Sequence, residues 1–183
     1  MQRICTVNGI RTHGEGSTDL LGSELSARGF DVTDIDQKVR HTWNVWNKRK
    51  VAKDVEEVLD YSLDGDVLIG HSYGCYKIAL AMKQRNYKAV FLFRPAMSKY
   101  YQFPLTAKNT AVYCVHASSD WVIWFGSLVP HHAFGIAGTV GFSDPLVNNI
   151  RSKGRWNHST DFHPPDVRQA WVDYIEELYP AIL

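Results

Sequence analysis

Four short stretches of the chain are almost wholly apolar: residues 4–7, 67–69, 89–93 and 111–115. An uninterrupted apolar run suits a β-strand covered on both faces, as in a parallel sheet, whereas a strand with one wet face alternates apolar and polar residues. Residues 30–36 alternate in this second way. We therefore predict four central strands and a fifth strand nearer the edge of the sheet.

Three segments instead repeat apolar residues three or four positions apart, which is the spacing of one helix face. They are residues 48–62, 73–86 and 164–180. The second is apolar enough to lie deep in the protein, and the third opens with two prolines, which suit a first helical turn. We place a sixth strand at residues 147–153, just before the last helix.

Strands alternating with helices predict the α/β class, with a mostly parallel, doubly wound sheet of about six strands between two helical layers. The chain has 183 residues, of which 45% are hydrophobic, enough for one buried core. With no internal repeat and no linker, we expect a single domain over residues 1–183. Residues 121–145 are rich in glycine and aromatics without a clean period, which predicts a long functional loop.

The net charge indicates which kinds of partner to expect. A formal net charge of +1 gives no field to attract nucleic acid, so we expect a small-molecule or lipid-like substrate and no nucleic acid. Three cysteines, Cys5, Cys75 and Cys114, have neither a paired framework nor zinc-ligand spacing. We see no signal peptide or membrane span, and expect a cytoplasmic protein with reduced thiols.

The stretch DVLIGHSYGCYKIAL contains the pattern Gly-x-Ser-x-Gly, with Ser72 between Gly70 and Gly74. A predicted strand precedes it and a predicted helix follows it. Ser72 then falls on a tight bend above the carboxyl edge of the sheet, where the glycines avoid collisions of a Cβ atom. The helix N-terminus also directs free backbone N–H groups at this point. The sequence therefore predicts a nucleophilic serine.

A serine nucleophile needs a base, and the base needs a carboxylate that orients it. Asp120 follows the strand at 111–115, and His158 lies in the loop before the last helix. Two rivals fit less well. Asp144 precedes a proline, which suits a turn, and His163 directly precedes two prolines, which marks a helix boundary. We predict Asp120 as the acid and His158 as the base.

With these motifs the chain resembles the α/β-hydrolase superfamily, especially small esterase- and lipase-like members without a large cap domain. The resemblance covers most of the chain. VNGI, at residues 7–10, resembles the first-strand glycine loop of the family, although Asn8 stands where the family usually has histidine. SSDWVI and NHSTDF resemble the loops that carry the family's acid and histidine. The resemblance implies an oxyanion hole formed by the amide of Tyr73 and that of Ile10 or Arg11.

We therefore expect a serine hydrolase of carboxylic esters that needs no cofactor and no metal. We expect His71, Trp121 and Trp124 to border the substrate. Two alternatives remain open: a binding module on the same fold, and a lipid-surface acyl hydrolase or acyltransferase. The second rests on the basic, tryptophan-bearing segment 40–53, although a helix that starts at residue 42 or 44 would make its lysines a solvated mid-helix face. Membrane contact and the oligomeric state are left open.

Overall fold

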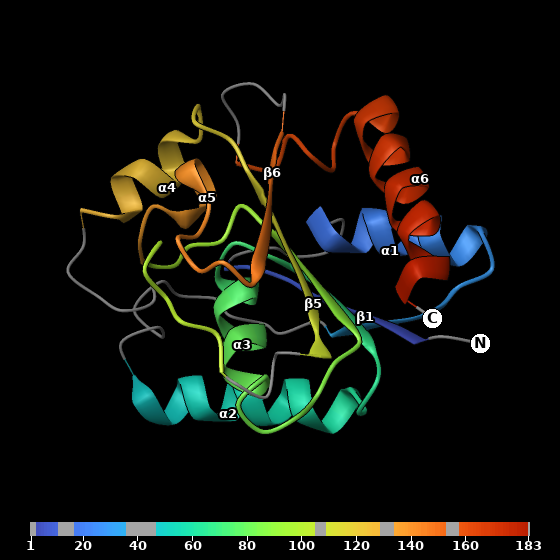
Figure 1. Cartoon of the computed structure of the whole chain (residues 1–183), viewed down its shortest axis with the longest axis horizontal. Helices are drawn as coiled ribbons and strands as arrows, with labels where there is room; N and C mark the ends of the chain where they lie inside the picture. The colour runs from blue at the N-terminus through green and yellow to red at the C-terminus, as the bar shows by residue number, and fades with distance from the viewer. Residues whose placement is uncertain are drawn as a thin grey trace.

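The computed structural model describes residues 3–10, 17–35, 47–104, 109–128, 134–152 and 158–182. Their strands form one six-stranded sheet, parallel throughout, in the order β2-β1-β3-β4-β5-β6 (Figure 1). The strands are β1 (Arg3–Val7), β2 (Asp31–Ile35), β3 (Val67–His71), β4 (Ala89–Phe93), β5 (Ala111–His116) and β6 (Val147–Arg151). The predicted fold class is confirmed, and the alternating strand, β2, lies at an edge as expected.

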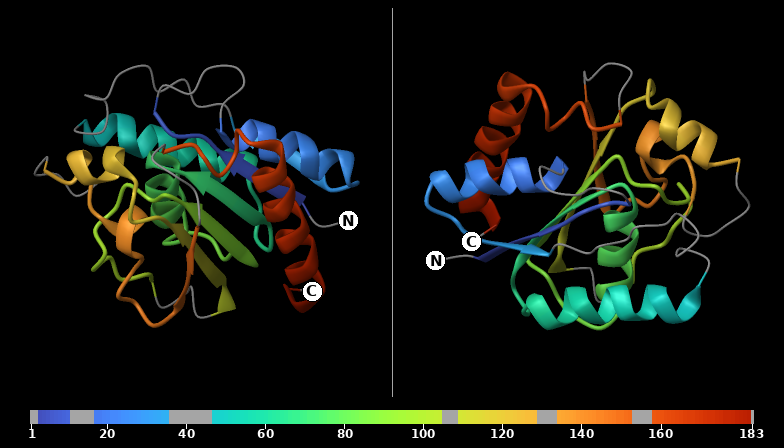
Figure 2. Two further views of the ribbon diagram at one scale, coloured as in Figure 1. Left: turned by 90° about the horizontal axis from the view of Figure 1, so that it is seen from above. Right: turned by 180° about the vertical axis from the view of Figure 1, so that it is seen from behind.

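Helices cover both faces of this sheet (Figure 2). They are α1 (Ser17–Ala27), α2 (Lys48–Tyr61), α3 (Tyr73–Ala81), α4 (Trp121–Gly126), α5 (Ala137–Val140) and α6 (Pro165–Ile182). One apolar cluster joins α1 and α6 to one face of the sheet, and another joins α2, α3 and α5 to the opposite face. The arrangement has three layers, helix, sheet and helix.

The central strands are apolar at every position because successive side chains enter different clusters. In β4, Phe91 and Phe93 pack toward α1 and α6, whereas Val90 and Leu92 pack toward α2 and α3. All five residues of β4 are buried. This confirms the sequence-based reason for placing the strand in the interior of a parallel sheet.

Helix α1 was not predicted. Its sequence, STDLLGSELSA, is interrupted by Gly22, which weakens a helical pattern. Gly22 is buried against strands β1 and β2, and a Cβ there would lie 3.3 Å from side-chain atoms of both Thr6 and Val32. Gly22 is therefore a point where α1 closely approaches the sheet. The spacing of hydrophobic residues along the sequence does not reveal such a contact.

Two predicted element ends need correction, whereas the predicted start of α2 at residue 48 is confirmed over the alternative at 42 or 44. Helix α3 ends at Ala81 rather than at residue 86, and β6 ends at Arg151 rather than at 153. Helix α2 begins at Lys48, because the side chain of Asn47 caps it by accepting from the amides of Arg49 and Lys50. Its basic residues therefore lie in the first turn and are exposed, rather than in the middle of a helix. The part of the segment at 40–46 lies outside the described residues.

The segment at 121–145, expected to be irregular, contains two short helices, α4 and α5. Asp120 caps α4, with its Oδ1 accepting from the amide of Ile123 at 3.1 Å. The Asp120 carboxylate thus caps a helix in a segment where many aromatic and glycine residues hide the helical spacing of the apolar positions. No helix among the described residues is long and apolar enough to cross a membrane.

Candidate active site

Ser72 lies at the sharp turn between β3 and α3, where the sequence analysis placed it. Its φ of 55° and ψ of −119° put a non-glycine residue in a strained backbone conformation. Backbone hydrogen bonds fix it, with the Ser72 amide donating to Phe93 O at 3.0 Å and the Ala96 amide donating to Ser72 O at 3.3 Å. Ser72 is therefore held in a conformation that few non-glycine residues adopt.

The two glycines of the motif are required for space. A Cβ on Gly74 would collide with the carbonyl oxygen of Val7 and lie 2.8 Å from that of Asn8. A Cβ on Gly70 would lie 2.6 Å from Cδ1 of Ile78. Helix α3 can therefore start directly against the end of β1 because Gly74 has no side chain, and it can pack closely on β3 because Gly70 has none.

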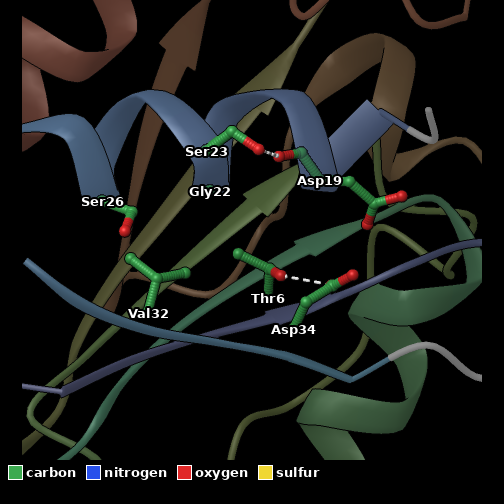
Figure 3. A pocket seen from close by; sticks show the side chains of 7 residues that line it. All are labelled: Thr6, Asp19, Gly22, Ser23, Ser26, Val32 and Asp34. Atoms are coloured by element: carbon green, nitrogen blue, oxygen red, sulfur yellow. Dashed lines mark hydrogen bonds between the residues drawn. The ribbon is translucent and has the colours of Figure 1, made fainter. Parts of the chain in front are cut away.

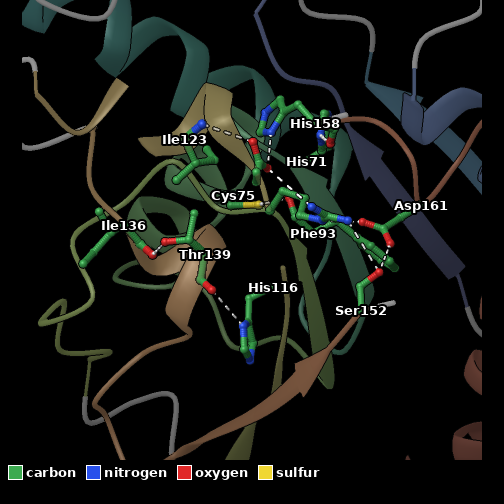
Figure 4. A network of polar contacts seen from close by, with 12 residues as sticks. His71, Cys75, Phe93, His116, Ile123, Ile136, Thr139, Ser152, His158 and Asp161 are labelled. Atoms are coloured by element: carbon green, nitrogen blue, oxygen red, sulfur yellow. Dashed lines mark hydrogen bonds and ion pairs between the residues drawn. The ribbon is translucent and has the colours of Figure 1, made fainter. Parts of the chain in front are cut away.

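Asp120 and His158, which are 38 positions apart in the chain, are in direct contact (Figure 4). His158 Nδ1 lies 2.6 Å from Asp120 Oδ2, and the Asp120 side chain is fully buried. The carboxylate can only accept, so Nδ1 carries the proton and Nε2 is an unprotonated acceptor whenever the ring is neutral. This is the tautomer that a general base requires.

His158 Nε2 is buried and has no hydrogen-bond partner among the described residues, and Ser72 Oγ does not reach it. Buried polar atoms are nearly always satisfied, so an exception calls for a reason, and a proton-accepting role is one. Contacts between catalytic groups are often long in structures without substrate. The structure thus joins the predicted acid to the predicted base and presents the serine separately.

The predicted oxyanion hole falls on the turn after β1. Tyr73 is the first residue of α3, where a backbone amide has no partner within the helix. Ile10 packs against the Tyr73 side chain. A Cβ on Gly9 would lie 3.1 Å from Ser72 Cβ, so this glycine lets the turn approach the serine closely. Arg11 lies outside the described residues.

Asn8, the departure from the family pattern, anchors this turn. Its Oδ1 accepts from Thr18 Oγ1 at 2.5 Å, and its Nδ2 donates to Asp19, both on α1. Its backbone carbonyl accepts from Lys77 Nζ at 3.0 Å. Lys77 is fully buried on α3, and burial lowers the pKa of its ammonium group to about 8. The turn is therefore attached to helices on both faces of the sheet.

His71 precedes the serine and is buried, with 2% of its surface exposed. Its Nε2 donates to the backbone carbonyl of His158 at 3.0 Å, so its Nδ1 accepts from Ser17 Oγ, 2.7 Å away. Burial keeps the pKa of His71 well below its ordinary value, and the ring is neutral. Both nitrogens bind protein atoms, which makes this ring an anchor for the His158 loop.

Trp121 and Trp124 lie on α4 and are 54% and 55% exposed. With Phe125 and Leu128 they form an exposed apolar stripe at the spacing i, i+3, i+4 and i+7. Each tryptophan ring packs at about a right angle to the ring of Phe125. The stripe follows directly from Asp120, but contact with a substrate remains a prediction.

The sequence analysis missed a buried polar group beside Asp120, the predicted acid. Arg94 follows β4 and is fully buried; its Nε donates to Asp161 Oδ2 at 2.6 Å, and its Nη1 lies 3.7 Å from Asp120 Oδ2. Ser152 Oγ donates to the other oxygen of Asp161 at 2.5 Å (Figure 4). The signal in the sequence is an arginine that interrupts the apolar run FLFRPAM.

The two rival residues have other surroundings. Asp144 accepts from the amides of Phe103 and Leu146, as a turn residue does, and His163 is exposed. Among the described residues, no group of three histidine, cysteine or acidic side chains could hold a metal ion. The three cysteines are all buried and free.

A cavity of about 400 Å³ lies elsewhere, between α1 and the β1–β2 edge of the sheet (Figure 3). It is lined by Thr6, Asp19, Gly22, Ser23, Ser26, Val32 and Asp34. The acidic side chains have protein partners: Asp34 accepts from Thr6 Oγ1 at 2.6 Å, and Asp19 accepts from Asn8. None of the lining residues belongs to the predicted triad.

Comparison with solved structures fits the topology. Alpha/beta hydrolase domain-containing protein 10 from mouse superposes with a TM-score of 0.67 at 14% identity, over 99% of this chain and 90% of the mouse chain. The chain has the α/β-hydrolase fold. The YdeN protein of B. subtilis gives 0.60 at 12% identity, over 96% of this chain and all of that chain.

A pyrethroid hydrolase from Sphingobium faniae shares the α/β-hydrolase fold too, with a TM-score of 0.56 at 12% identity, over 96% of this chain and 97% of its own. No protein-family model matches the sequence, and no curated protein matches it either. The likeness is therefore one of fold, and the argument about chemistry depends on the site residues themselves.

Proposed function

We propose that this α/β-hydrolase fold is a serine hydrolase that cleaves carboxylic esters, with Ser72 as nucleophile, His158 as base and Asp120 as orienting acid. The observation that carries the proposal is the 2.6 Å contact between His158 Nδ1 and Asp120 Oδ2. It fixes the tautomer in which the unpartnered Nε2 can take a proton. The strained bend at Ser72 supports the same assignment.

In the proposed reaction, Ser72 Oγ attacks the ester carbonyl while its proton passes to His158 Nε2. The carbonyl π electrons move to the oxygen, and the resulting oxyanion is stabilised by the amide of Tyr73 and a second amide at Ile10 or Arg11. The C–O bond then breaks, and the imidazolium returns the proton to the leaving alcohol. Water, deprotonated by the same imidazole, hydrolyses the acyl-enzyme and regenerates Ser72.

The test is Ser72→Ala against a panel of p-nitrophenyl esters, together with labelling by a fluorophosphonate. We expect wild-type protein to hydrolyse the esters and to be labelled, and Ser72→Ala to do neither while unfolding at the same temperature. Ser143→Ala is the matched control, because Ser143 is exposed and should keep full activity. Ester hydrolysis that survives Ser72→Ala contradicts the proposal.

The substrate proposal is a small ester with an apolar acyl group, and the exposed aromatic stripe on α4 supports it. The stripe begins one residue after Asp120, so an acyl chain attached at Ser72 could extend along it. Trp124→Ala should lower kcat/KM for octanoate esters about 10-fold more than for acetate esters, which corresponds to about 1.4 kcal/mol of lost apolar contact. Equal losses for both chain lengths would exclude this role.

A binding module on the same fold is the second candidate, favoured by one observation. Ser72 Oγ is not hydrogen-bonded to His158 Nε2 in this structure, so the nucleophile is not yet coupled to its base. Fluorophosphonate labelling separates the two functions, because it needs an activated serine but no knowledge of the substrate. Folded wild-type protein that resists the label would favour binding without turnover.

A further inference from the structure

A buried cation lies between two buried carboxylates next to the proposed base. The guanidinium of Arg94 bonds Asp161 at 2.6 Å and lies 3.7 Å from the Asp120 oxygen that holds His158. The side chains of Arg94, Asp120 and Asp161 are all fully buried. Water does not screen these charges, so each strongly affects the protonation of its neighbours.

The ion pairs come from segments that the fold brings together. Arg94 follows β4 with a φ of 48°, an uncommon conformation for a residue with a side chain, and its amide donates to Val115 O at 2.8 Å. Asp161 lies three residues after His158 and is bonded by Ser152 Oγ, just after β6. The guanidinium therefore links the ends of the central strands to the loop that carries the base.

The charges around His158 indicate a role for Arg94. With the ring of His158 neutral, Asp120, Asp161 and Arg94 together carry one negative charge, which the imidazolium formed during proton transfer would cancel. Without Arg94, two uncompensated carboxylates would lie beside the ring. Their combined negative charge would favour the protonated form of the ring. A protonated His158 cannot act as a base.

We infer that Arg94 is a positioning residue of the proposed triad: its charge holds the Asp120 carboxylate aimed at His158 and offsets the negative charge of Asp161 beside the ring. The catalytic effect of Arg94 rests on the proposed function, whereas its electrostatic effect on Asp120 and His158 rests on the ion pairs alone. Nη1 of Arg94 has no hydrogen-bond partner among the described residues, so no other direct bond competes with its electrostatic attraction to Asp120.

Charged and titratable groups from several elements surround His158. Among the described residues, the charged and titratable neighbours are Asp120 at the start of α4, Arg94 after β4, His71 at the end of β3, and Asp161 and His163 in its own loop. His71 is neutral because burial holds its pKa well below the ordinary value, so it contributes no charge at neutral pH. The carboxylates and Arg94 therefore dominate.

The test uses opposite charge changes. NMR of ¹³C-labelled histidine gives the pH at which the His158 ring protonates, with the signal assigned from His158→Ala. Arg94→Gln should move that pH upward by about one unit, and Asp161→Asn should move it downward by a similar amount. The double variant, which removes one charge of each sign, should return within about 0.3 of wild type. The acidic limb of kcat/KM should shift in the same directions.

A purely structural role predicts something else: each variant would lose activity and thermal stability, while the protonation of His158 would stay unchanged. Shifts of one sign for both single variants, or none, would overturn the inference. Arg94→Lys keeps the charge and should leave the His158 signal near wild type although kcat falls. If Arg94→Gln does not fold, the double variant compared with Asp161→Asn measures the same loss of the Arg94 charge, and an upward shift between these two still decides.

Arg28→Gln is the control for removal of a positive charge, since Arg28 is 40% exposed and pairs with Asp173 and Glu176 on α6, away from the site. It should leave the His158 signal unmoved. The NMR titration needs no turnover, so it separates the two hypotheses. If wild-type protein hydrolyses no ester and resists fluorophosphonate, the proposed function fails, while the titration still tests the role of Arg94.

Discussion

The imidazole rings of His71 and His158 lie 4.5 Å apart, and His71 Nε2 donates to the backbone carbonyl of His158. The residue before the proposed nucleophile thus holds the loop of the proposed base. Ser17 Oγ, at the start of α1, occupies the other nitrogen of His71. The neutral ring of His71 thus connects three parts of the chain. The phenyl ring of Phe162 also packs against it edge-on.

The first prediction concerns the acid stability of the fold. Burial depresses the pKa of His71, so the folded protein leaves the ring neutral while the unfolded chain protonates it below about pH 6.5. The stability associated with the neutral ring is present above that pH and is lost as the pH falls toward the folded value. Between pH 6.5 and 5, the free energy of unfolding should fall by up to about 1.4 kcal/mol per unit from this group.

Urea unfolding at pH 7.5, 6.5, 5.5 and 5.0 measures this effect. His71→Gln should be less stable than wild type at pH 7.5, but its stability should decline less steeply on acidification. The exposed His163 provides the control, and His163→Gln should follow the wild-type curve. Parallel curves for His71→Gln and wild type would show that the ring is not held neutral.

The second prediction separates the two bonds made by Asp120, which caps α4 with one oxygen and binds His158 with the other. Asn is as good a helix cap as Asp, so Asp120→Asn should keep α4. Its amide would present a donor to His158 and favour the wrong tautomer, so kcat should fall about 10⁴-fold, the size of the loss for this change in a serine protease. Asp120→Ala should lose the cap too, about 1 kcal/mol.

Steady-state kinetics with a p-nitrophenyl ester and thermal unfolding followed by circular dichroism give the two readouts. A loss of activity below 10-fold in Asp120→Asn would mean that another carboxylate orients the base. Asp161 is the nearest alternative in the network, and Asp161→Asn should therefore be measured in parallel. Its kcat should fall far less than that of Asp120→Asn.

The third prediction concerns the space at the bend. Gly74→Ala would drive a methyl group into the carbonyl oxygen of Val7, so α3 or β1 would have to move. We expect a loss of about 3 kcal/mol or more in unfolding free energy, together with loss of fluorophosphonate labelling. Gly126→Ala is the control, because its Cβ would meet only Phe134 at an ordinary 3.6 Å. Similar stability for both variants would contradict the packing argument.

Most of the sheet could be predicted because its apolar runs are local signals, as β4 shows. The bend at Ser72 could be predicted as well, since Gly70 and Gly74 are dictated by close packing. Helix α1 could not, because Gly22 is fixed by contact with β1 and β2, which a single stretch of sequence does not reveal. Tertiary contact overrides local propensity at such positions.

The same distinction applies to the site. The sequence placed Asp120 and His158 on loops at the correct edge of the sheet, but the contact between them depends on the path of the chain between β5 and α6. Arg94 could not be assigned a role from the sequence, because an arginine after an apolar run is as often a surface residue as a buried one. Its role appears only once Asp161 is seen beside it.

The last prediction concerns Lys77, whose ammonium group is buried under the turn that would carry the oxyanion hole. Burial lowers its pKa to about 8, against an ordinary value of 10.5. Between these values the unfolded chain holds a proton that the folded protein has released. The free energy of unfolding therefore gains a contribution that rises with pH in this window.

Lys77→Met lacks that contribution. The stability of wild type minus that of Lys77→Met should accordingly increase by about 2 kcal/mol between pH 8 and pH 10. The difference is the quantity to measure, because burial raises the pKa of Cys5 and Tyr101 to about 12 and these groups change stability with the opposite sign. Lys83→Met, at an exposed position, should show the wild-type dependence. A difference that stays constant with pH would mean that Lys77 remains charged in the folded protein.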